Sequence, residues 1–590
     1  MTVVRFVQKQ HRLFLLAALF VSCRLFAASL PAVEAQHGMV VSSQRLASQV
    51  GVDILKLGGN AVDAAVAVGY AQAVVNPCCG NIGGGGFMTL RLADGRDVFL
   101  DFREKAPSAA TADMYLDASG QVVKSASLKG YRAVGVPGTV LGLDTALQKY
   151  GRLSRQQVMQ PAIRLARQGF VLARGDTDII DSKVATIRDD LEAAKIFLRR
   201  DGSPLQPGDR LVQKDLARTL QEIAQRGPEA FYRGRIPAAV ERAAQAAGGI
   251  LTAADFADYA ISEREPVRCD YRGYLFISAP PPSSGGVTLC QILNTLEGYD
   301  LKSLGFNSAA SVHVLVEAMR HAYLDRNTLL GDPAFVNNPL DRLLSKDYAA
   351  TIRQRIGDQA TPSADVRPGV PPHESTETTH YSIIDGEGNA VAVTYTINGR
   401  FGAAVIAPGT GFFLNNEMDD FTVKVGAKNL YRLVQGAQNA IAPGKRPLSS
   451  MSPTLVIRDG RVFMVLGSPG GSRIISIVLQ TALNVIDHGM AAQEAVDAPR
   501  IHHQWLPDKV YFEMRGLSPD TQKILREMGH ELVEQMPWGA AELILVGLPG
   551  AEGAKVASSG NDSALSGKVR PGYLYGASDP RRPAGAAIGY

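Results

Sequence analysis

Two adjacent threonines, Thr378 and Thr379, stand where a polar segment passes directly into a strand pattern, ESTETTHYSIIDGEGNAVAVTYT. Threonine alone is a weak nucleophile, but cleavage of the peptide bond before it would place an α-amino base beside its hydroxyl. The unperturbed pKa of that amine, about 7.7–8.0, is close to neutral pH. Such a site needs an exposed loop before the threonine and a strand after it, and residues 361–396 have both features. Threonine is also common in strands. From this pattern alone, a purely structural role for the threonine is as well supported as a catalytic one.

Other familiar catalytic motifs are absent from the sequence. No G-x-S-x-G, H-E-x-x-H or G-x-x-x-x-G-K-[ST] pattern occurs. The pair His502–His503 lacks a third candidate ligand, which favours a surface or structural role. The run Gly83–Gly86 could cradle a phosphate, but nothing that binds nucleotide follows it, so a tight turn is favoured. Cys78–Cys79 lacks zinc spacing, and the four cysteines after Cys23 are too few for a disulfide scaffold, so we expect small residues packed in a turn.

The N-terminus has the features of a secretory signal. Basic residues precede the apolar run LFLLAALFVSC, and small residues follow it in LFAASLPAVEAQ. We expect cleavage near Ala35, so that residues 1–35 are removed, although Arg24 interrupts the apolar run. Cys23 leaves lipidation open as an alternative, despite a poor lipobox before it. No later run reaches the length of a transmembrane helix, so the sequence predicts an exported chain, periplasmic or secreted.

Charge and hydrophobic patterning favour an α+β fold without nucleic-acid binding. The 590 residues carry 61 basic and 57 acidic side chains, with no basic stripe. Ser42–Ser43 can cap a first helix, and Asn60 begins a second that is nearly all apolar. Residues 110–350 read as mostly helical. Hairpins are expected in FMTLRLADGRDVFLDF, HYSIIDGEGNAVAVTYTI and SPTLVIRDGRVFMVLG, and a helix in SIVLQTALNVIDHG. This order predicts antiparallel sheets covered by helices.

The sequence around Thr378 resembles the start of the small subunit of γ-glutamyltranspeptidases, which are N-terminal nucleophile hydrolases. The resemblance extends over nearly the whole chain after the signal and keeps the family's order of motifs. These motifs are GGNAVDAAVAVGYAQAVVNP, GNIGGGGFM, DFREKAP, APPPSSGG, LLGDP, LNNEMDDF, RPLSSMSPT, GSPGGSRI and DPRRPAGAAIGY. The resemblance implies a four-layer αββα sandwich, whereas patterning alone reaches only α+β.

The resemblance also implies how the chain matures and which residues carry the reaction. The precursor would cut itself between Glu377 and Thr378, giving a large subunit of residues 36–377 and a small catalytic subunit of residues 378–590 within one intertwined unit. Thr378 would be the nucleophile, and Thr396 would hydrogen-bond its hydroxyl. The backbone N–H groups of Gly470 and Gly471 would form the oxyanion hole. No metal or organic cofactor is implied.

The remaining implied residues would recognise a γ-linked glutamate. Arg103 would hold the α-carboxylate, because its planar fork suits two oxygens. The other implied contacts are Asn398 with the substrate, Glu417 and Asp420 with the α-ammonium, and Ser449 and Ser450 with the α-carboxylate. The segment VKVGAKNLYRLVQGAQN resembles a lid, with Tyr431 as its closing aromatic.

These features predict γ-glutamyl transfer from glutathione and related compounds to water, amino acids or dipeptides. Three alternatives stay open: an acylase or poly-γ-glutamate enzyme of the same superfamily, an exported binding protein with an inactive site, and a nucleotide-binding module. The motifs FREKAP and NNEMDD argue against the first, and intact Thr378 and Thr396 argue against the second. Only the glycine run supports the third.

Overall fold

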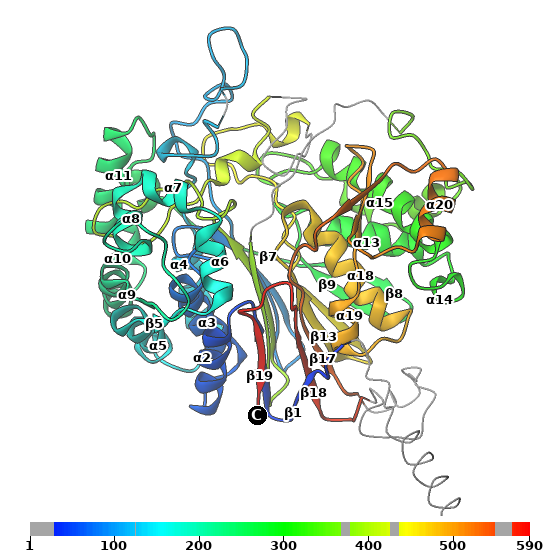
Figure 1. Ribbon diagram of the computed structural model, residues 1–590, viewed down its shortest axis with the longest axis horizontal. Helices are drawn as coiled ribbons and strands as arrows, with labels where there is room; N and C mark the ends of the chain where they lie inside the picture. Colours follow the sequence, from blue (N-terminus) through cyan, green and yellow to red (C-terminus); the bar gives the residue numbers. More distant parts are fainter. Residues whose placement is uncertain (1–28, 124, 367–377, 425–435, 549–568) are drawn as a thin grey trace, which may run out of the picture. The chain divides into compact units, whose positions relative to one another are not determined.

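Two seven-stranded antiparallel sheets pack against each other and carry helices on their outer faces (Figure 1). This arrangement is seen in a computed structural model, which describes residues 29–123, 125–366, 378–424, 436–548 and 569–590. Residues Ala32–Tyr590 form one compact unit, to which every element below belongs. The αββα sandwich that the family resemblance implies is confirmed. Within the described part of the chain, no helix is long and apolar enough to span a membrane.

The first sheet, called sheet I, has the Thr378 hairpin at its centre. Its strands in spatial order are β19 (Ala586–Gly589), β2 (Gly38–Ser42), β10 (Thr379–Asp385), β11 (Ala390–Thr396), β3 (Gly85–Arg91), β4 (Asp97–Phe102) and β7 (Ser262–Arg264). The hairpins β3–β4 and β10–β11 form as their alternating patterns predict. In the central pair, Thr379 lies opposite Tyr395.

The second sheet, sheet II, lies over the inner face of sheet I. Its strands in spatial order are β1 (Val33–Ala35), β18 (Leu574–Ser578), β17 (Glu542–Val546), β13 (Arg461–Gly467), β12 (Thr454–Arg458), β9 (Tyr274–Ser278) and β8 (Val267–Tyr271). The β12–β13 hairpin also forms as predicted. Apolar side chains fill the space between the sheets, for example Met39 and Ile384 from sheet I and Leu455 and Ile544 from sheet II.

Helices from the first half of the chain cover sheet I through one apolar cluster. They are α2 (Arg45–Lys56), α3 (Ala61–Val75), α4 (Thr139–Tyr150), α5 (Arg155–Gln168), α6 (Arg174–Asp181), α7 (Val184–Asp189), α8 (Leu191–Phe197), α9 (Lys214–Arg226), α10 (Glu229–Tyr232), α11 (Arg235–Ala246) and α12 (Ala253–Ala257). As its apolar sequence predicts, α3 is buried along its whole length, and Asn60 begins it with a capping box to Asp63.

A second group of helices covers sheet II through its own apolar cluster. They are α13 (Gly285–Leu296), α14 (Leu301–Leu304), α15 (Ala309–Leu329), α16 (Leu340–Leu343), α17 (Lys346–Arg353), α18 (Ile474–Ile486), α19 (Ala492–Asp497) and α20 (Pro519–Glu527). Two small sheets complete the fold: β5 (Phe170–Val171) with β6 (Arg210–Leu211), and β14 (Ile501–His502), β15 (Val510–Glu513) and β16 (Leu532–Gln535). Helix α18 confirms the helix predicted after the β12–β13 hairpin.

Two local predictions were wrong. The first helix is capped by Gln44, whose side chain accepts a hydrogen bond from the backbone of Leu46, and not by Ser42 or Ser43. Ser42 instead ends β2. The mostly helical reading of residues 110–350 missed strands β7, β8 and β9. These strands complete one edge of each sheet: β7 pairs with the distant β4 and β9 with the distant β12, whereas β8 and β9 form a local hairpin around Arg272–Gly273.

The cysteines also differ from the prediction. Cys78 and Cys79 are buried in a turn, as expected, but they are disulfide-bonded to each other. Cys269 in β8 and Cys290 in α13 form a second disulfide. The expected structural role of His502 is confirmed, because it is buried and hydrogen-bonds to Ser476 and Gln504.

Candidate active site

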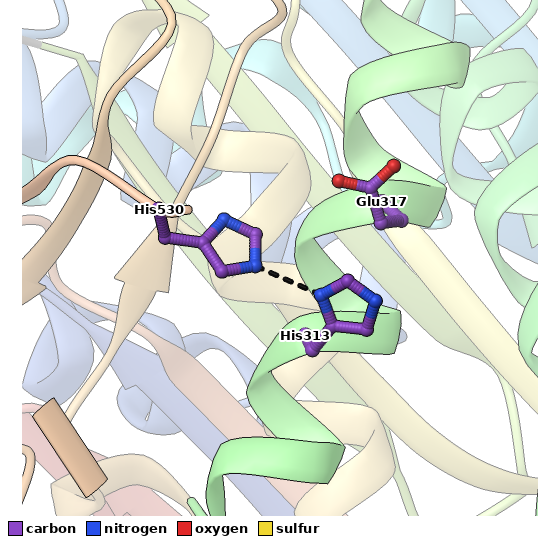
Figure 2. A group of neighbouring side chains, drawn as sticks. All are labelled: His313, Glu317 and His530. Carbon is purple, nitrogen blue, oxygen red and sulfur yellow. Dashed lines mark hydrogen bonds between the residues drawn. The ribbon is translucent and has the colours of Figure 1, made fainter. Parts of the chain in front are cut away.

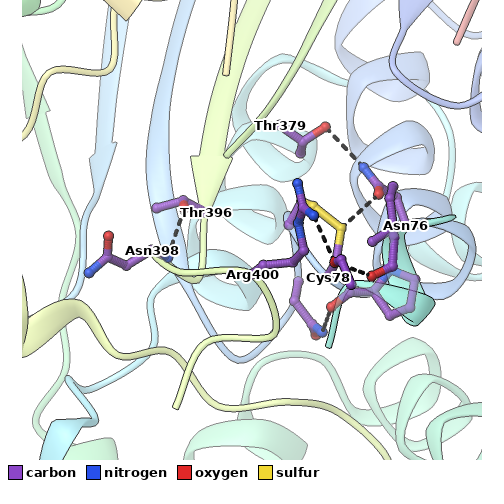
Figure 3. Close-up of a disulfide and its surroundings, with 11 residues drawn as sticks. Asn76, Cys78, Thr379, Thr396, Asn398 and Arg400 are labelled. Atoms are coloured by element: carbon purple, nitrogen blue, oxygen red, sulfur yellow. Dashed lines mark hydrogen bonds between the residues drawn. A yellow bond between two sulfur atoms is a disulfide. The ribbon is translucent and has the colours of Figure 1, made fainter. Parts of the chain in front are cut away.

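Thr378 is held at the entrance to a strand that is fixed on both sides. It immediately precedes β10, which pairs with β2 and with β11, and it is 4% exposed. The next residue, Thr379, accepts a hydrogen bond at its hydroxyl from Nδ2 of Asn76, 3.3 Å away (Figure 3). A residue in this position has little freedom to move, which is what a nucleophile at a new chain end needs.

A pocket beside Thr378 gathers most of the residues implied by the resemblance. Its lining includes Thr378, Thr396, Arg103, Glu417, Asp420, Ser449, Ser450 and Gly471. These residues come from six separate places in the chain, so the pocket exists only in the folded protein. Gly470 precedes the lining residue Gly471, and Asn398 lies two positions after the lining residue Thr396, but neither is itself part of the lining.

Thr396 ends β11 and lies in a tight backbone environment. Its Oγ1 accepts a hydrogen bond from the backbone N–H of Asn398 at 2.8 Å (Figure 3). Asn398 has a positive φ of 67° and donates through Nδ2 to the carbonyl of Asn416. A Cβ on Gly84 would lie 1.9 Å from the Thr396 carbonyl oxygen, so the glycine run packs directly on the site. Gly83 and Gly84 lie in a turn and a bend, as predicted, but Gly85 and Gly86 begin strand β3, so the tight-turn prediction holds only for the first half of the run. The hydrogen bond predicted between Thr396 and Thr378 stays a prediction.

Arg103 forms ion pairs with Glu417 and Asp420. The resemblance assigns these two acids to the α-ammonium of the substrate and Arg103 to its α-carboxylate. Arg103 follows β4, is 1% exposed, and donates to Glu417 Oε1 and, at 2.5 Å, to Asp420 Oδ2. Both acids lie on one short 3-10 helix, Glu417–Asp420. Buried charges require partners, and these groups provide them for one another.

Burial changes the proton affinities of this cluster strongly. Burial disfavours the charge on Arg103, but Glu417 and Asp420 together hold the pKa of the guanidinium above its usual value. Burial raises the pKa of Glu417 well above its usual value, although Arg103 opposes the shift. Burial also raises the pKa of the neighbouring Glu104 to about 7. Arg103 is therefore a strong cation beside three carboxyl groups whose charged forms are disfavoured by burial.

Arg326 is a second buried guanidinium in the pocket, which sequence reasoning missed. It lies near the end of α15 and donates to the Ser450 hydroxyl at 2.9 Å and to the Ser284 hydroxyl at 3.0 Å. Among the described residues, no carboxylate oxygen lies within 4 Å of its guanidinium, and burial lowers its pKa to about 10. Ser284 also donates to the carbonyl of Ser449, which joins the two serine motifs. The sequence signal that could have revealed Arg326 is a charged residue within α15, a helix that is buried along most of its length.

Gly470 and Gly471 lead into α18 with backbone angles that other residues rarely adopt. Their φ values are 146° and 56°. A short 3-10 turn, Gly471–Arg473, connects them to the helix, so they lie at its positive N-terminal end. Gly471 lines the pocket. This arrangement is compatible with an oxyanion hole, which remains a prediction.

Two predicted residues, Glu377 and Tyr431, lie outside the described residues. The described ends of the predicted lid segment are joined to each other beside the pocket. The backbone N–H of Thr422 donates to the carbonyl of Asn439 at 2.8 Å, and Asn439 Nδ2 donates to the carbonyl of Asp420 at 2.6 Å.

A second cavity also reaches Thr378. Its lining includes Asn76, Asp176, Arg400 and Trp538. Thr378 therefore lines two cavities, the charged pocket described above and this larger one.

The fold and the position of Thr378 define a class of protein: an αββα sandwich with a candidate threonine nucleophile at the start of a central strand, as in N-terminal nucleophile hydrolases. A family model described as Gamma-glutamyltranspeptidase matches residues 47–589, and the chain belongs to that family.

Comparisons with individual proteins agree with this assignment. The glutathione hydrolase proenzyme of Pseudomonas sp. (strain A14) is 57% identical over 579 residues, which is 98% of each chain. The glutathione hydrolase proenzyme of Escherichia coli (strain K12) is 48% identical over 560 residues, covering 95% of this chain and 93% of its own. The crystal structure of cephalosporin acylase from Bacillus halodurans matches with a TM-score of 0.80 at 26% identity, covering 96% of this chain and 98% of its own.

Proposed function

We propose that this chain is the proenzyme of a γ-glutamyltransferase and glutathione hydrolase. It transfers the γ-glutamyl group of glutathione and related compounds to water or to amino acid and dipeptide acceptors. One observation carries the proposal: Thr378 shares a single pocket with the Arg103 cation and with the Glu417 and Asp420 carboxyl groups. These charges complement the α-carboxylate and the α-ammonium of a γ-linked glutamate.

Substrate binding exchanges the partners of these buried charges. The α-carboxylate of the glutamyl group takes Arg103, supported by Ser450 and Arg326, while the α-ammonium takes Glu417 and Asp420. Every charge then remains paired, so the substrate enters without leaving a buried ion alone. A ligand with only one of the two charges would leave part of the pocket unpaired, which makes the site selective for the zwitterion.

The reaction uses the two groups that self-cleavage brings together on Thr378. The hydroxyl attacks the γ-carbonyl carbon, and the α-amino group takes the hydroxyl proton. The carbonyl oxygen becomes an oxyanion near the N–H groups of Gly470 and Gly471. The carbonyl reforms, the amine of the leaving peptide departs with the proton, and a γ-glutamyl ester remains on Thr378. Water or an acceptor amine then enters through the larger cavity and attacks this ester, and the hydroxyl of Thr378 is restored.

Maturation creates this nucleophile. The precursor cuts itself between Glu377 and Thr378, giving a large subunit that ends at Glu377 and a small subunit of residues 378–590 that stay together. The buried, strand-anchored position of Thr378 supports this cleavage site. The signal-like N-terminus supports export to the periplasm or beyond. The predicted cut near Ala35 would remove β1 (Val33–Ala35), which pairs with β18, so we propose a cut before Val33 and a large subunit that begins there. A denaturing gel of the purified protein, with N-terminal sequencing of the smaller band, tests the assignment. A smaller chain that begins elsewhere, or a fully active uncut chain, would contradict it.

A superfamily acylase is the second candidate, and the match to the cephalosporin acylase favours it. The two functions differ in what they require at the α-carbon. We therefore compare a γ-glutamyl anilide with the glutaryl anilide, which lacks only the ammonium. The transferase proposal predicts a much lower kcat/KM for the glutaryl compound, because Glu417 and Asp420 then have no cation to bind. Equal turnover of both would identify an acylase pocket.

A further inference from the structure

A buried group of two histidines and a glutamate lies outside the candidate active site (Figure 2). His313 and Glu317 are one turn apart on α15, so both side chains lie on the same face of the helix. His530 comes from the segment just after α20. One ligand atom from each residue lies within 4.8 Å of the others, and the three residues are at most 4% exposed. We propose that these residues bind one divalent transition-metal ion of the zinc class.

The hydrogen bonds of His313 prepare one ring nitrogen as a ligand. Its Nε2 is 2.8 Å from the carbonyl oxygen of Gly357, which can only accept, so Nε2 carries the proton. Nδ1 is therefore unprotonated, and it accepts a hydrogen bond from Nε2 of His530, 2.9 Å away (Figure 2). A metal ion between the two rings would take the place of this proton, which would be released or move to Nδ1 of His530. A backbone carbonyl that fixes the tautomer is a common second partner of metal-binding histidines. Two nitrogens on one tetrahedral zinc ion are about 3.3 Å apart, so the rings need to part only slightly.

Glu317 supplies a negative ligand that has a spare oxygen. Its Oε1 accepts from Arg320 Nε at 3.1 Å and from the backbone N–H of Thr361 at 3.3 Å. Its Oε2 is fully buried and has no hydrogen-bond partner among the described residues. Nδ1 of His530 is buried without a partner as well. Unpaired polar atoms in an interior are costly, and a bound cation would satisfy the carboxylate oxygen.

The surrounding charges can accept a cation. Arg320 also pairs with Asp508, so two carboxylates share one guanidinium. Two imidazoles and one carboxylate form a donor set that suits zinc better than calcium or magnesium, which prefer oxygen ligands. The fourth ligand position is then left to water or to a nearby backbone group.

The ion would tie α15 to the segment after α20. Arg326, on the same helix, lies about 20 Å further along the helix axis than His313 and contacts Ser450 in the pocket. The site is therefore structural, and it does not depend on the proposed function. Sequence analysis indicated no metal, because the two histidines are 217 positions apart in the chain.

The test measures metal in the untagged, full-length protein, because a histidine tag would itself bind zinc. Protein from zinc-supplemented medium is dialysed against metal-free buffer and analysed by mass spectrometry, and apo protein is titrated with Co²⁺. We expect about one equivalent of zinc per chain and a visible Co²⁺ absorption band typical of four-coordinate sites. Metal removal should lower the temperature of thermal unfolding.

Three variants make the result specific. His530→Ala and Glu317→Gln should each lose the retained zinc and the Co²⁺ band, whereas His488→Ala, a histidine outside the group, should keep both. Glu317→Gln preserves the size of the side chain and an oxygen for Arg320, so it remains informative if His530→Ala does not fold. A wild-type protein that retains no zinc and shows no Co²⁺ band would overturn the proposal. Equal zinc retention in Glu317→Gln and His488→Ala would also overturn it.

Discussion

Replacement of Arg103 should separate the two roles that the structure gives to this side chain. In the structure Arg103 pairs with Glu417 and Asp420, and in the proposed complex it binds the substrate α-carboxylate. Arg103→Ala removes both roles, since it leaves two buried carboxyl groups without a cation. Arg103→Lys keeps a positive charge but loses the planar fork that donates to two oxygens at once.

The expected sizes follow from the burial of these groups. Breaking a buried ion pair costs about 3–5 kcal/mol of folding stability, so Arg103→Ala should be clearly less stable than the wild type. Proton uptake by Glu417 offsets part of this loss, because burial already raises its pKa. Loss of the carboxylate partner should cost about 2–5 kcal/mol in the transition state. At about 1.4 kcal/mol for each factor of ten, kcat/KM should fall roughly 30-fold to several-thousand-fold.

The assay combines turnover of a γ-glutamyl anilide, thermal unfolding, and a gel that reports self-cleavage. Arg103→Lys should unfold nearer to the wild type than Arg103→Ala does, yet it should still have a strongly reduced kcat/KM. Both variants should still be cleaved, because the cut involves no substrate. Arg91→Lys is the matched control, since Arg91 pairs with Asp97 at the other end of the same β3–β4 hairpin. Wild-type kcat/KM in Arg103→Lys, or an Arg103→Ala defect no larger than that of the control, would refute the reasoning.

Other changes give separate expectations. Thr378→Ala should yield one uncut band and no turnover, while Thr378→Ser should keep some of both activities; a cleaved and active alanine variant would exclude Thr378 as the nucleophile. Thr396→Ala removes one orienting hydrogen bond and should cost only about 0.5–1.5 kcal/mol in kcat/KM. Arg326→Met should raise KM for the γ-glutamyl anilide more than it lowers kcat, and steady-state kinetics with unchanged KM would exclude its role at the carboxylate. Burial raises the pKa of Glu104 to about 7 from 4.5, so its stabilising contribution is complete below pH 4.5 and is lost as the pH rises through 7. The unfolding temperature of the wild type should therefore fall more over that range than that of Glu104→Gln, and parallel curves would contradict the assignment.

The parts of the fold that repeat locally could be predicted from the sequence. The β10–β11 hairpin follows from alternation around Gly386 and Gly388, and α3 follows from its cap and its apolar run. Strand β7 could not be found in this way, because it is held by pairing with the distant β4. The β8–β9 hairpin around Arg272–Gly273 is a local pattern that the mostly helical reading overlooked.

The candidate site also contains residues that the sequence predicts and contacts that it does not. Family motifs pointed to Thr378 and Arg103, but no local pattern shows that Arg103 is paired with Glu417. Arg326 was missed because its partner Ser450 is 124 residues away. A disulfide between neighbours such as Cys78 and Cys79 was missed because reasoning from spacing looks for separated pairs.

The order of the strands affects both the folding of the precursor and the ability of the cleaved protein to refold. In sheet II, four strands that follow Thr378 are flanked on both sides by strands that precede it, and in sheet I the β10–β11 pair is enclosed in the same way. Neither part of the chain could fold alone without exposing long sheet edges, so the uncut chain must act as its own template. After the cut, the two parts have no covalent path by which to find each other again. The mature molecule would then persist because it unfolds slowly, and an unfolding event that separates its parts would be irreversible.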